Sequence, residues 1–219
     1  MEASWQEVAL FRAGIYRFLG HCLLESLQGD RLALLQPEFW RSFPLAPAND
    51  VMGAALDKLV GVALSLQAMP EDAALEAVQT EYTALFLGVG DPLAPPWESL
   101  YRTPEKLMFG APAFAVREAM ARFGVEAAAK YRQPEDHLGL ELMLLAAASE
   151  AASLREETGW RESARLQAEF IAAHPLGWIG DLESDAATYG SVGFYAALLG
   201  LTRGVLLWDS ELLNEYISS

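Results

Sequence analysis

The segment SWQEVALFRAGIYRFLGHCLLESL, residues 4–27, carries a clear helical pattern. Its aromatic and aliphatic side chains recur every three or four residues, at Trp5, Val8, Phe11, Ile15, Phe18, Leu19, Cys22 and Leu23. Arg12 and Arg17 fall between these positions. Because this spacing matches the turn of an α-helix, the segment predicts an amphipathic helix with an apolar buried face and the two arginines on the other side.

The composition of the whole chain favours helices throughout. Of its 219 residues, 71 are alanine or leucine, whereas valine, isoleucine and threonine together number 20. Alanine and leucine lose little rotamer entropy in a helix, whereas β-branched residues suit strands. Hydrophobic residues make up 53% of the chain, which is enough for a sizeable core. We therefore expect an all-α protein and exclude a β-sandwich, a β-barrel and a valine-rich parallel sheet.

Periodicity and turn residues divide the chain into helices and loops. Helices are predicted at 4–27, 50–67, 70–87, 103–108, 111–123, 134–157, 160–173, 184–199 and 201–217. Loops are predicted at 37–49 and 88–97, with a link at 124–133. The chain contains no fixed-period repeat and no low-complexity linker. The sequence therefore predicts a single compact globular domain, residues 1–219, of about nine or ten helices.

The charge of the chain limits its partners. Thirty acidic and fifteen basic residues give a net charge of −15, which would repel nucleic acid and anionic lipid and attract a cationic partner. The single cysteine, Cys22, excludes an internal disulfide. The residues after Met1 have no signal-peptide pattern, and the longest apolar stretch, Phe194 to Trp208, is short for a membrane helix and contains Arg203. We expect a cytoplasmic protein without stable membrane insertion.

The sequence contains few signals for catalysis. It has neither a Gly-x-Ser-x-Gly motif nor a glycine-rich phosphate-binding motif. The best metal candidate is Asp136 and His137 with Glu141, because residues four apart share a helix face. Alternatively, the acids around His137 interact with a helix N-terminus and the imidazole binds a neighbouring loop. We expect no catalytic residue, no metal and no other cofactor, and we keep a metal- or nucleotide-dependent enzyme as the alternative.

One long stretch of the chain combines acidic and apolar residues. No lysine or arginine occurs from Leu59 to Tyr101, yet six acidic residues do: Glu71, Asp72, Glu76, Glu81, Asp91 and Glu98. The same stretch is rich in aromatic residues and proline. Such a region suits a peptide that carries arginines beside a hydrophobic run. A helix with a core-facing stripe and a solvated acidic face would give the same composition.

Three segments resemble those of a known family. They are Glu81–Gly88 (EYTALFLG), Pro95–Tyr101 (PPWESLY) and Pro134–Leu142 (PEDHLGLEL). In their residues, their order and their separation, these segments resemble those of the TorD/DmsD/NarJ family of redox-enzyme maturation chaperones. The segment PPWESLY most resembles the DmsD-like branch. Val89, where many relatives have proline, and Leu100, where valine is frequent, depart from the pattern.

The resemblance implies an all-α chaperone rather than an enzyme. Family members bind the twin-arginine signal peptide of a molybdenum-containing oxidoreductase and hold that catalytic subunit in the cytoplasm until its cofactor is inserted, before export. An adaptor for the assembly of another metalloenzyme remains an alternative. The oligomeric state stays open between a monomer and a domain-swapped dimer.

The family pattern also implies a peptide groove. Its members would be Tyr82, Leu85, Phe86, Pro95, Pro96, Trp97, Ser99 and Tyr101, with Asp136 and His137 packed beside them. On charge grounds we add Glu81 and Glu98 as partners for the leader arginines, because guanidinium groups pair well with carboxylates.

Overall fold

The computed structural model describes residues 4–88, 90–125 and 133–218. These residues form helices and no strand, which confirms the all-α expectation. The chain divides into two compact units: unit 1 comprises Met1–Leu24, Trp97–Trp178 and Asp209–Ser219, and unit 2 comprises Glu25–Pro96 and Ile179–Trp208. The single compact domain stays a prediction. None of the helices in the described part of the chain combines the length and apolar character needed to cross a bilayer.

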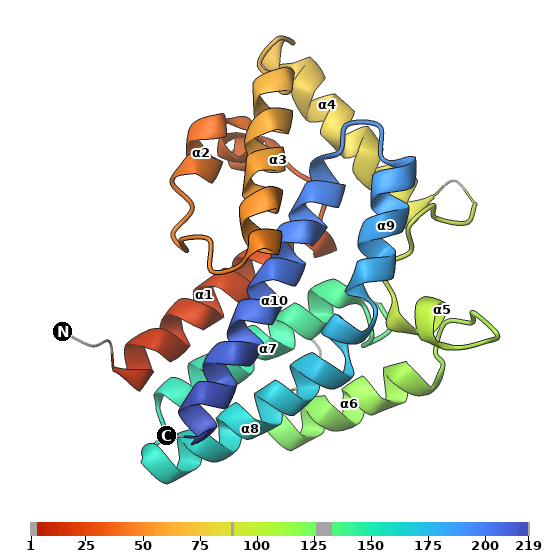
Figure 1. The fold of residues 1–219 in the computed structure, drawn as a ribbon. Helices are drawn as coiled ribbons and strands as arrows, with labels where there is room; N and C mark the ends of the chain where they lie inside the picture. Colours follow the sequence, from red (N-terminus) through yellow and green to blue (C-terminus); the bar gives the residue numbers. More distant parts are fainter. Residues whose placement is uncertain (1–3, 89, 126–132, 219) are drawn as a thin grey trace. The chain divides into compact units, whose positions relative to one another are not determined.

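The described residues of unit 1 form helices drawn in Figure 1. They are α1 (Trp5–Leu24), α5 (Glu98–Arg102), α6 (Ala111–Phe123), α7 (Leu138–Ser153), α8 (Glu157–Ala173) and the last turns of α10 (Phe194–Ser218), with a 3₁₀ turn at Pro175–Gly177. α1 packs along α7, and α6 lies alongside α8. A β-carbon on Gly139 would lie 2.6 Å from Leu24 Cγ, so the contact between α1 and α7 requires glycine there.

The start of α1 follows directly from its sequence. The Ser4 N–H donates to Glu7 Oε2 at 2.8 Å, and the Glu7 N–H donates to Ser4 Oγ at 3.3 Å, which is a capping box. The helix predicted at 4–27 is therefore confirmed to within a few residues. The expected place of Arg12 is wrong, because its side chain is fully buried and pairs with Asp209. Arg17 is exposed, as predicted.

Unit 2 contains the other helices and the first turns of α10. They are a 3₁₀ segment at Gly29–Leu35, α2 (Pro37–Arg41), α3 (Asp50–Leu66), α4 (Glu71–Tyr82), a π-helical turn at Thr83–Leu87 and α9 (Ile179–Tyr189). Asn49 caps α3 by accepting the Met52 N–H at 2.9 Å and also donates to the Gly204 carbonyl. A β-carbon on Gly204 would lie 2.7 Å from Met52 Cα, so α3 and α10 approach closely here.

Three predicted boundaries are wrong. The loop predicted at 37–49 begins with α2, because Pro37 occupies the first turn of a helix, where its missing N–H is harmless. The helix predicted at 103–108 forms instead at Glu98–Arg102, and Lys106 and Phe109 then adopt positive φ angles of 48° and 61°. The helix predicted at 134–157 covers only Leu138–Ser153. Most of the link predicted at 124–133 lies outside the described residues.

The last two helices also break at a different place. A break was expected at Gly200, between 184–199 and 201–217, but Gly200 lies inside α10. A β-carbon there would lie 3.0 Å from a Glu183 carboxylate oxygen, so glycine provides room for α9. The break occurs between Tyr189 and Phe194, and Gly193 has a φ of +83° that favours glycine.

Candidate functional site

In unit 1, the end of the segment Pro95–Tyr101, from Trp97 onward, is joined to the segment Pro134–Leu142. Trp97 pairs with His137 as an isolated antiparallel bridge, and the Glu98 N–H donates to the Asp136 carbonyl at 3.0 Å. The rings of Trp97 and His137 meet edge to face, with centroids 5.4 Å apart. His137 is the N-cap of α7, where its Nδ1 accepts the Gly139 N–H at 3.0 Å. The imidazole therefore fixes the start of α7 and its contact with Trp97.

Asp136 holds the first turn of α5. Its Oδ2 accepts the Ser99 N–H at 2.8 Å and also the Ser99 hydroxyl. Burial raises the pKa of Asp136, and the hydrogen bonds from Ser99 oppose that rise. Its other oxygen, Oδ1, is buried without a hydrogen-bond partner among the described residues. Asp136 thus orients α5 rather than presenting its carboxylate to solvent.

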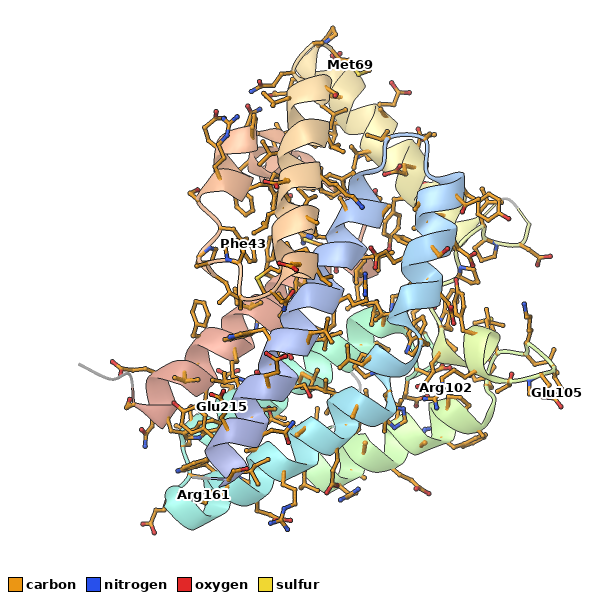
Figure 2. The ribbon with its side chains drawn as sticks, viewed as in Figure 1. Phe43, Met69, Arg102, Glu105, Arg161 and Glu215 are labelled. Carbon is orange, nitrogen blue, oxygen red and sulfur yellow. The ribbon has the colours of Figure 1, made fainter. Side chains whose placement is uncertain are left out.

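Glu98, the residue after Trp97, is only 1% exposed. Its Oε1 accepts from Arg102 Nη1 at 2.7 Å, and its Oε2 lies 2.8 Å from His174 Nδ1. Arg102 also donates to the Ala173 carbonyl at the end of α8, whereas Glu105 in the following loop points away (Figure 2). Nearby, Tyr101 stacks on Trp178 with ring centroids 5.5 Å apart. Glu98 therefore ties α5 to the end of α8.

His137, one of the candidate metal ligands considered from the sequence, is the N-cap of α7. Burial lowers the pKa of His137 to about 3, so the ring is neutral at neutral pH, and its Nδ1 is occupied by Gly139. Among the described residues, Asp136, His137 and Glu141 do not form a group whose ligand atoms converge on one point. Of these three candidate ligands, only Glu141 belongs to such a group among the described residues, so the alternative of a metal site at all three is not supported.

In unit 2, Glu81 is a buried helix cap. It is 1% exposed, and its carboxylate accepts the four consecutive backbone N–H groups of residues 192–195 at 2.6–3.2 Å. These N–H groups lie at the start of α10, where a helix leaves its donors unpaired and favours negative charge. A β-carbon on Gly190 would lie 2.9 Å from Glu81 Oε1, so glycine makes room for the cap. Pairing of Glu81 with a leader arginine stays a prediction.

The apolar residues predicted around Glu81 form a core in unit 2. Tyr82, Phe86 and Tyr195 meet with ring centroids 5.2–5.3 Å apart, and burial raises the pKa of Tyr82. Leu85 is fully buried, and its carbonyl accepts the Ala94 N–H at 2.8 Å. Pro96 is buried and Pro95 is half-buried. These residues pack in the interior of unit 2 and contribute little exposed surface.

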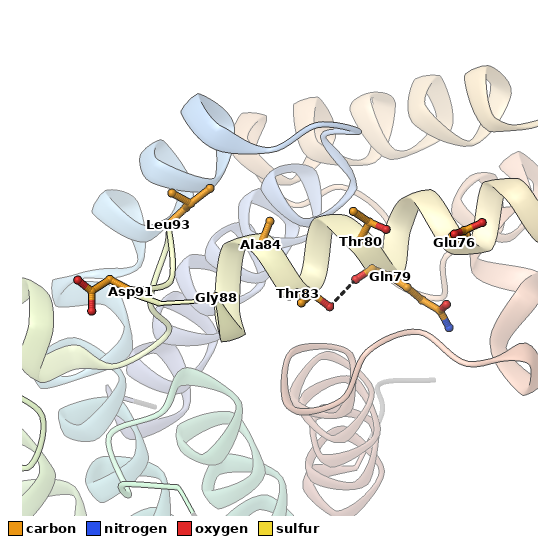
Figure 3. A pocket seen from close by; sticks show the side chains of 8 residues that line it. All are labelled: Glu76, Gln79, Thr80, Thr83, Ala84, Gly88, Asp91 and Leu93. Carbon is orange, nitrogen blue, oxygen red and sulfur yellow. Dashed lines mark hydrogen bonds between the residues drawn. The ribbon is translucent and has the colours of Figure 1, made fainter.

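The exposed surface of α4 and its π-helical turn contains a hollow. This hollow has a volume of about 510 Å³, and Figure 3 shows the side chains around it. Its lining residues are Glu76, Gln79, Thr80, Thr83, Ala84, Gly88, Asp91 and Leu93. The π-turn closes with the Gly88 N–H donating to the Thr83 carbonyl at 2.7 Å, at a φ of +64° for Gly88. Such turns often accompany functional sites.

Sequence reasoning named none of these eight residues as contacts. A signal was present, because Glu76, Thr80 and Thr83 recur at helical spacing within the stretch that lacks lysine and arginine. The predicted residues divide between the units: Glu81, Tyr82, Leu85, Phe86, Pro95 and Pro96 belong to unit 2, and Trp97, Glu98, Ser99, Tyr101, Asp136 and His137 to unit 1. Whether they act on one peptide stays a prediction.

Comparison with known proteins identifies the family of the chain. Residues 47–184 match the family described as nitrate reductase delta subunit. The chain is 28% identical over 207 residues to the chaperone protein TorD of Vibrio cholerae, covering 94% of this chain and 93% of that one. It is 29% identical over 213 residues to TorD of Vibrio vulnificus, covering 95% and 98%.

A further relative carries the other name of the group. The probable Tat proofreading chaperone DmsD of Haemophilus influenzae is 30% identical over 148 residues, covering 67% of this chain and 68% of that one. Relatives with both names are found, so the nearer likeness to the DmsD-like branch stays a prediction. These relatives are named as chaperones and not as enzymes. The chain therefore belongs to the nitrate reductase delta subunit family, the TorD/DmsD/NarJ family of redox-enzyme maturation chaperones.

Proposed function

We propose that the chain binds the twin-arginine signal peptide of a molybdenum-containing oxidoreductase. It would hold the catalytic subunit in the cytoplasm until the cofactor is inserted, and release it for export afterwards. Membership of the family supports this proposal, and one relative is named a probable Tat proofreading chaperone. The net charge of −15 also favours a cationic peptide over nucleic acid or an anionic membrane.

The hollow on α4 is the observation that carries the proposal. Glu76 and Asp91 are exposed acidic residues on its lining, and Leu93 and Ala84 supply apolar contacts beside them. A twin-arginine leader presents two guanidinium groups ahead of an apolar run, which matches such a surface. No lysine or arginine occurs between residues 59 and 101 to compete for these carboxylates from the same stretch of chain.

The residues predicted from the sequence have structural roles, each within its own unit. In unit 2, Glu81 holds the start of α10, and Tyr82, Leu85 and Phe86 are buried residues of α4 and the π-helical turn, the two elements that also line the hollow. In unit 1, the bridge of Trp97 with His137 fixes the other family segments. In this proposal, Glu76 and Asp91 contact the arginines and the buried set maintains the shapes of the two units.

The test is calorimetric titration of the full chain with a synthetic twin-arginine leader. The double variant Glu76→Gln, Asp91→Asn should bind about tenfold more weakly, because two charge-assisted contacts worth roughly 0.5–1 kcal/mol each are lost. The matched control is Glu71→Gln, Asp72→Asn, which removes two acidic groups from the same helix outside the hollow. Equal weakening in both variants, or equally tight binding of a twin-lysine leader, would contradict the proposed site.

A further inference from the structure

Glu141 is an unusual buried acid. Its side chain is 0% exposed, and neither carboxylate oxygen has a hydrogen-bond partner among the described residues. The indole N–H of Trp178 and the carboxylate of Glu98 lie nearby, but neither reaches hydrogen-bonding geometry with Glu141. A buried carboxylate without partners is strongly destabilising, so the fold must neutralise it with a proton or a cation. Neither the capping of α7 nor the bridge of Trp97 with His137 uses this side chain.

Two further ligand-bearing side chains converge on Glu141. One ligand atom each from Glu98, Glu141 and His174 lie within 4.8 Å of one another. The three residues come from α5, α7 and the residue that ends α8, so three elements of unit 1 supply the group. We propose that Glu98, Glu141 and His174 form a binding site for one divalent transition-metal ion of the Zn²⁺ type.

The donor set determines the chemistry of the ion. An imidazole nitrogen with two carboxylates suits Zn²⁺ better than Mg²⁺ or Ca²⁺, which prefer oxygen ligands alone. Arg102 binds Glu98 through Oε1, whereas Oε2 faces His174 Nδ1. The ion would use Glu98 Oε2, His174 Nδ1 and a Glu141 oxygen. Bonds of about 2.0–2.2 Å to these three atoms need only small side-chain rotations from the present separations.

The site has an entry path within unit 1. His174 lines a hollow of about 310 Å³ between α6 and α8 and is 14% exposed there, whereas Glu98 and Glu141 are enclosed. Glu118, Glu169 and Arg122 line the same hollow, and Arg122 pairs with Glu169 at 3.9 Å, so Glu118 is the acidic group that would attract a cation there. An ion could therefore reach the imidazole first and the two carboxylates next. Three protein ligands leave a fourth position for water, as open zinc sites have.

The experiment measures binding of Zn²⁺ to the full chain after treatment with a chelator and dialysis. One Zn²⁺ per chain is expected by elemental analysis, with an increase in melting temperature, because an ion that binds only the folded state stabilises it. Glu141→Gln and His174→Gln should each lower the Zn²⁺ affinity at least about 100-fold, since even the loss of a group that merely orients a ligand lowers it 10–100-fold. Mg²⁺ should produce neither effect.

A matched variant separates this site from binding at the acidic surface. Glu150 is an exposed residue of α7, the helix that also contains the buried Glu141. Glu150→Gln removes one negative charge there, as Glu141→Gln does, and should leave Zn²⁺ binding unchanged. Glu141→Gln retains the shape of the side chain and removes a buried charge, so its folding should be preserved, as the melting temperature without metal will show. Failure of the wild-type chain to bind Zn²⁺, or equal binding by Glu141→Gln and His174→Gln, would overturn the proposal and leave a proton as the neutralising cation.

Discussion

Two groups of acidic residues, one in each unit, have opposite surroundings. In unit 1, Glu98, Asp136 and Glu141 are enclosed, and the first two are occupied by Arg102, His174 and Ser99. In the hollow of unit 2, Glu76 and Asp91 are exposed. The net charge of −15 therefore contains two kinds of carboxylate: buried ones that hold helix ends together and exposed ones available to a cationic ligand. The amino-acid composition does not distinguish these two kinds of carboxylate, whereas their burial in the structure does.

The largest effect should come from breaking a buried pair in unit 1. Asp209 accepts from Arg12, and its Oδ2 also accepts the Tyr16 hydroxyl at 2.6 Å, all without solvent exposure. Asp209→Ala leaves the buried guanidinium without a counter-ion, with Gln167 as a remaining hydrogen-bond acceptor, so the free energy of unfolding should fall by about 3–5 kcal/mol in urea denaturation.

An exposed pair in the same unit provides the control for that loss. Glu150→Ala removes the partner of Arg17, whose side chain is 44% exposed, and should change the stability by less than about 1 kcal/mol. A loss of stability in Glu150→Ala as large as in Asp209→Ala would remove the distinction between buried and exposed carboxylates.

Within unit 2, α4 allows the same comparison along one helix. Glu81→Gln replaces a carboxylate that accepts four N–H groups by an amide with one acceptor, so we expect a loss of about 2–3 kcal/mol of stability. Glu76→Gln on the same helix should be nearly neutral for folding but should weaken leader binding. If Glu81→Gln folds as stably as wild type and only binding suffers, then Glu81 contacts the leader, as the sequence first indicated.

The sequence revealed local features well and distant partners poorly. The helix at 4–27 was predictable because its period and its Ser4–Glu7 cap are local. The burial of Arg12 was not, because its partner, Asp209, is 197 residues away. Likewise, Glu81 looked like a free acid until residues 192–195 supplied its partners. Gly200 looked like a helix end because its close neighbour, Glu183, lies on another helix.

The candidate site follows the same rule. Contacts within one motif are short-range, such as the hydrogen bond from the Gly139 N–H to His137, and a local pattern can indicate them. Which side of each motif faces solvent depends on packing between segments. From the sequence, the hollow residues Glu76 and Asp91 and the buried Glu98 all look like members of one acidic stretch. The pairing of Glu98 with a leader arginine stays a prediction.

The neutral His137 should make stability depend on pH. Its pKa is about 3 in the folded state, against an ordinary value near 6.5, because burial disfavours the charged ring. As pH falls below 6.5, the unfolded chain takes up a proton that the folded chain does not, so stability decreases. This group alone should remove roughly 1 kcal/mol between pH 7 and pH 5.5. His137→Asn keeps an N-cap acceptor for Gly139, and its pH profile by thermal melting should be flatter by that amount. Parallel profiles for the two proteins would contradict this and mean that His137 has the same pKa in the folded and the unfolded chain.

The smallest effect expected is the dependence of leader binding on salt. Exposed carboxylates such as Glu76 and Asp91 attract a guanidinium through solvent, and the Debye length falls from about 10 Å at 0.1 M salt to about 3 Å at 1 M. Raising the salt over that range should weaken wild-type binding several-fold, mainly through a slower association rate. The variant Glu76→Gln, Asp91→Asn should lose most of this dependence, whereas Glu71→Gln, Asp72→Asn should retain it. If the dependence is the same in all three proteins, the attraction arises from the overall charge of the chain, and the hollow has no special share in steering the leader.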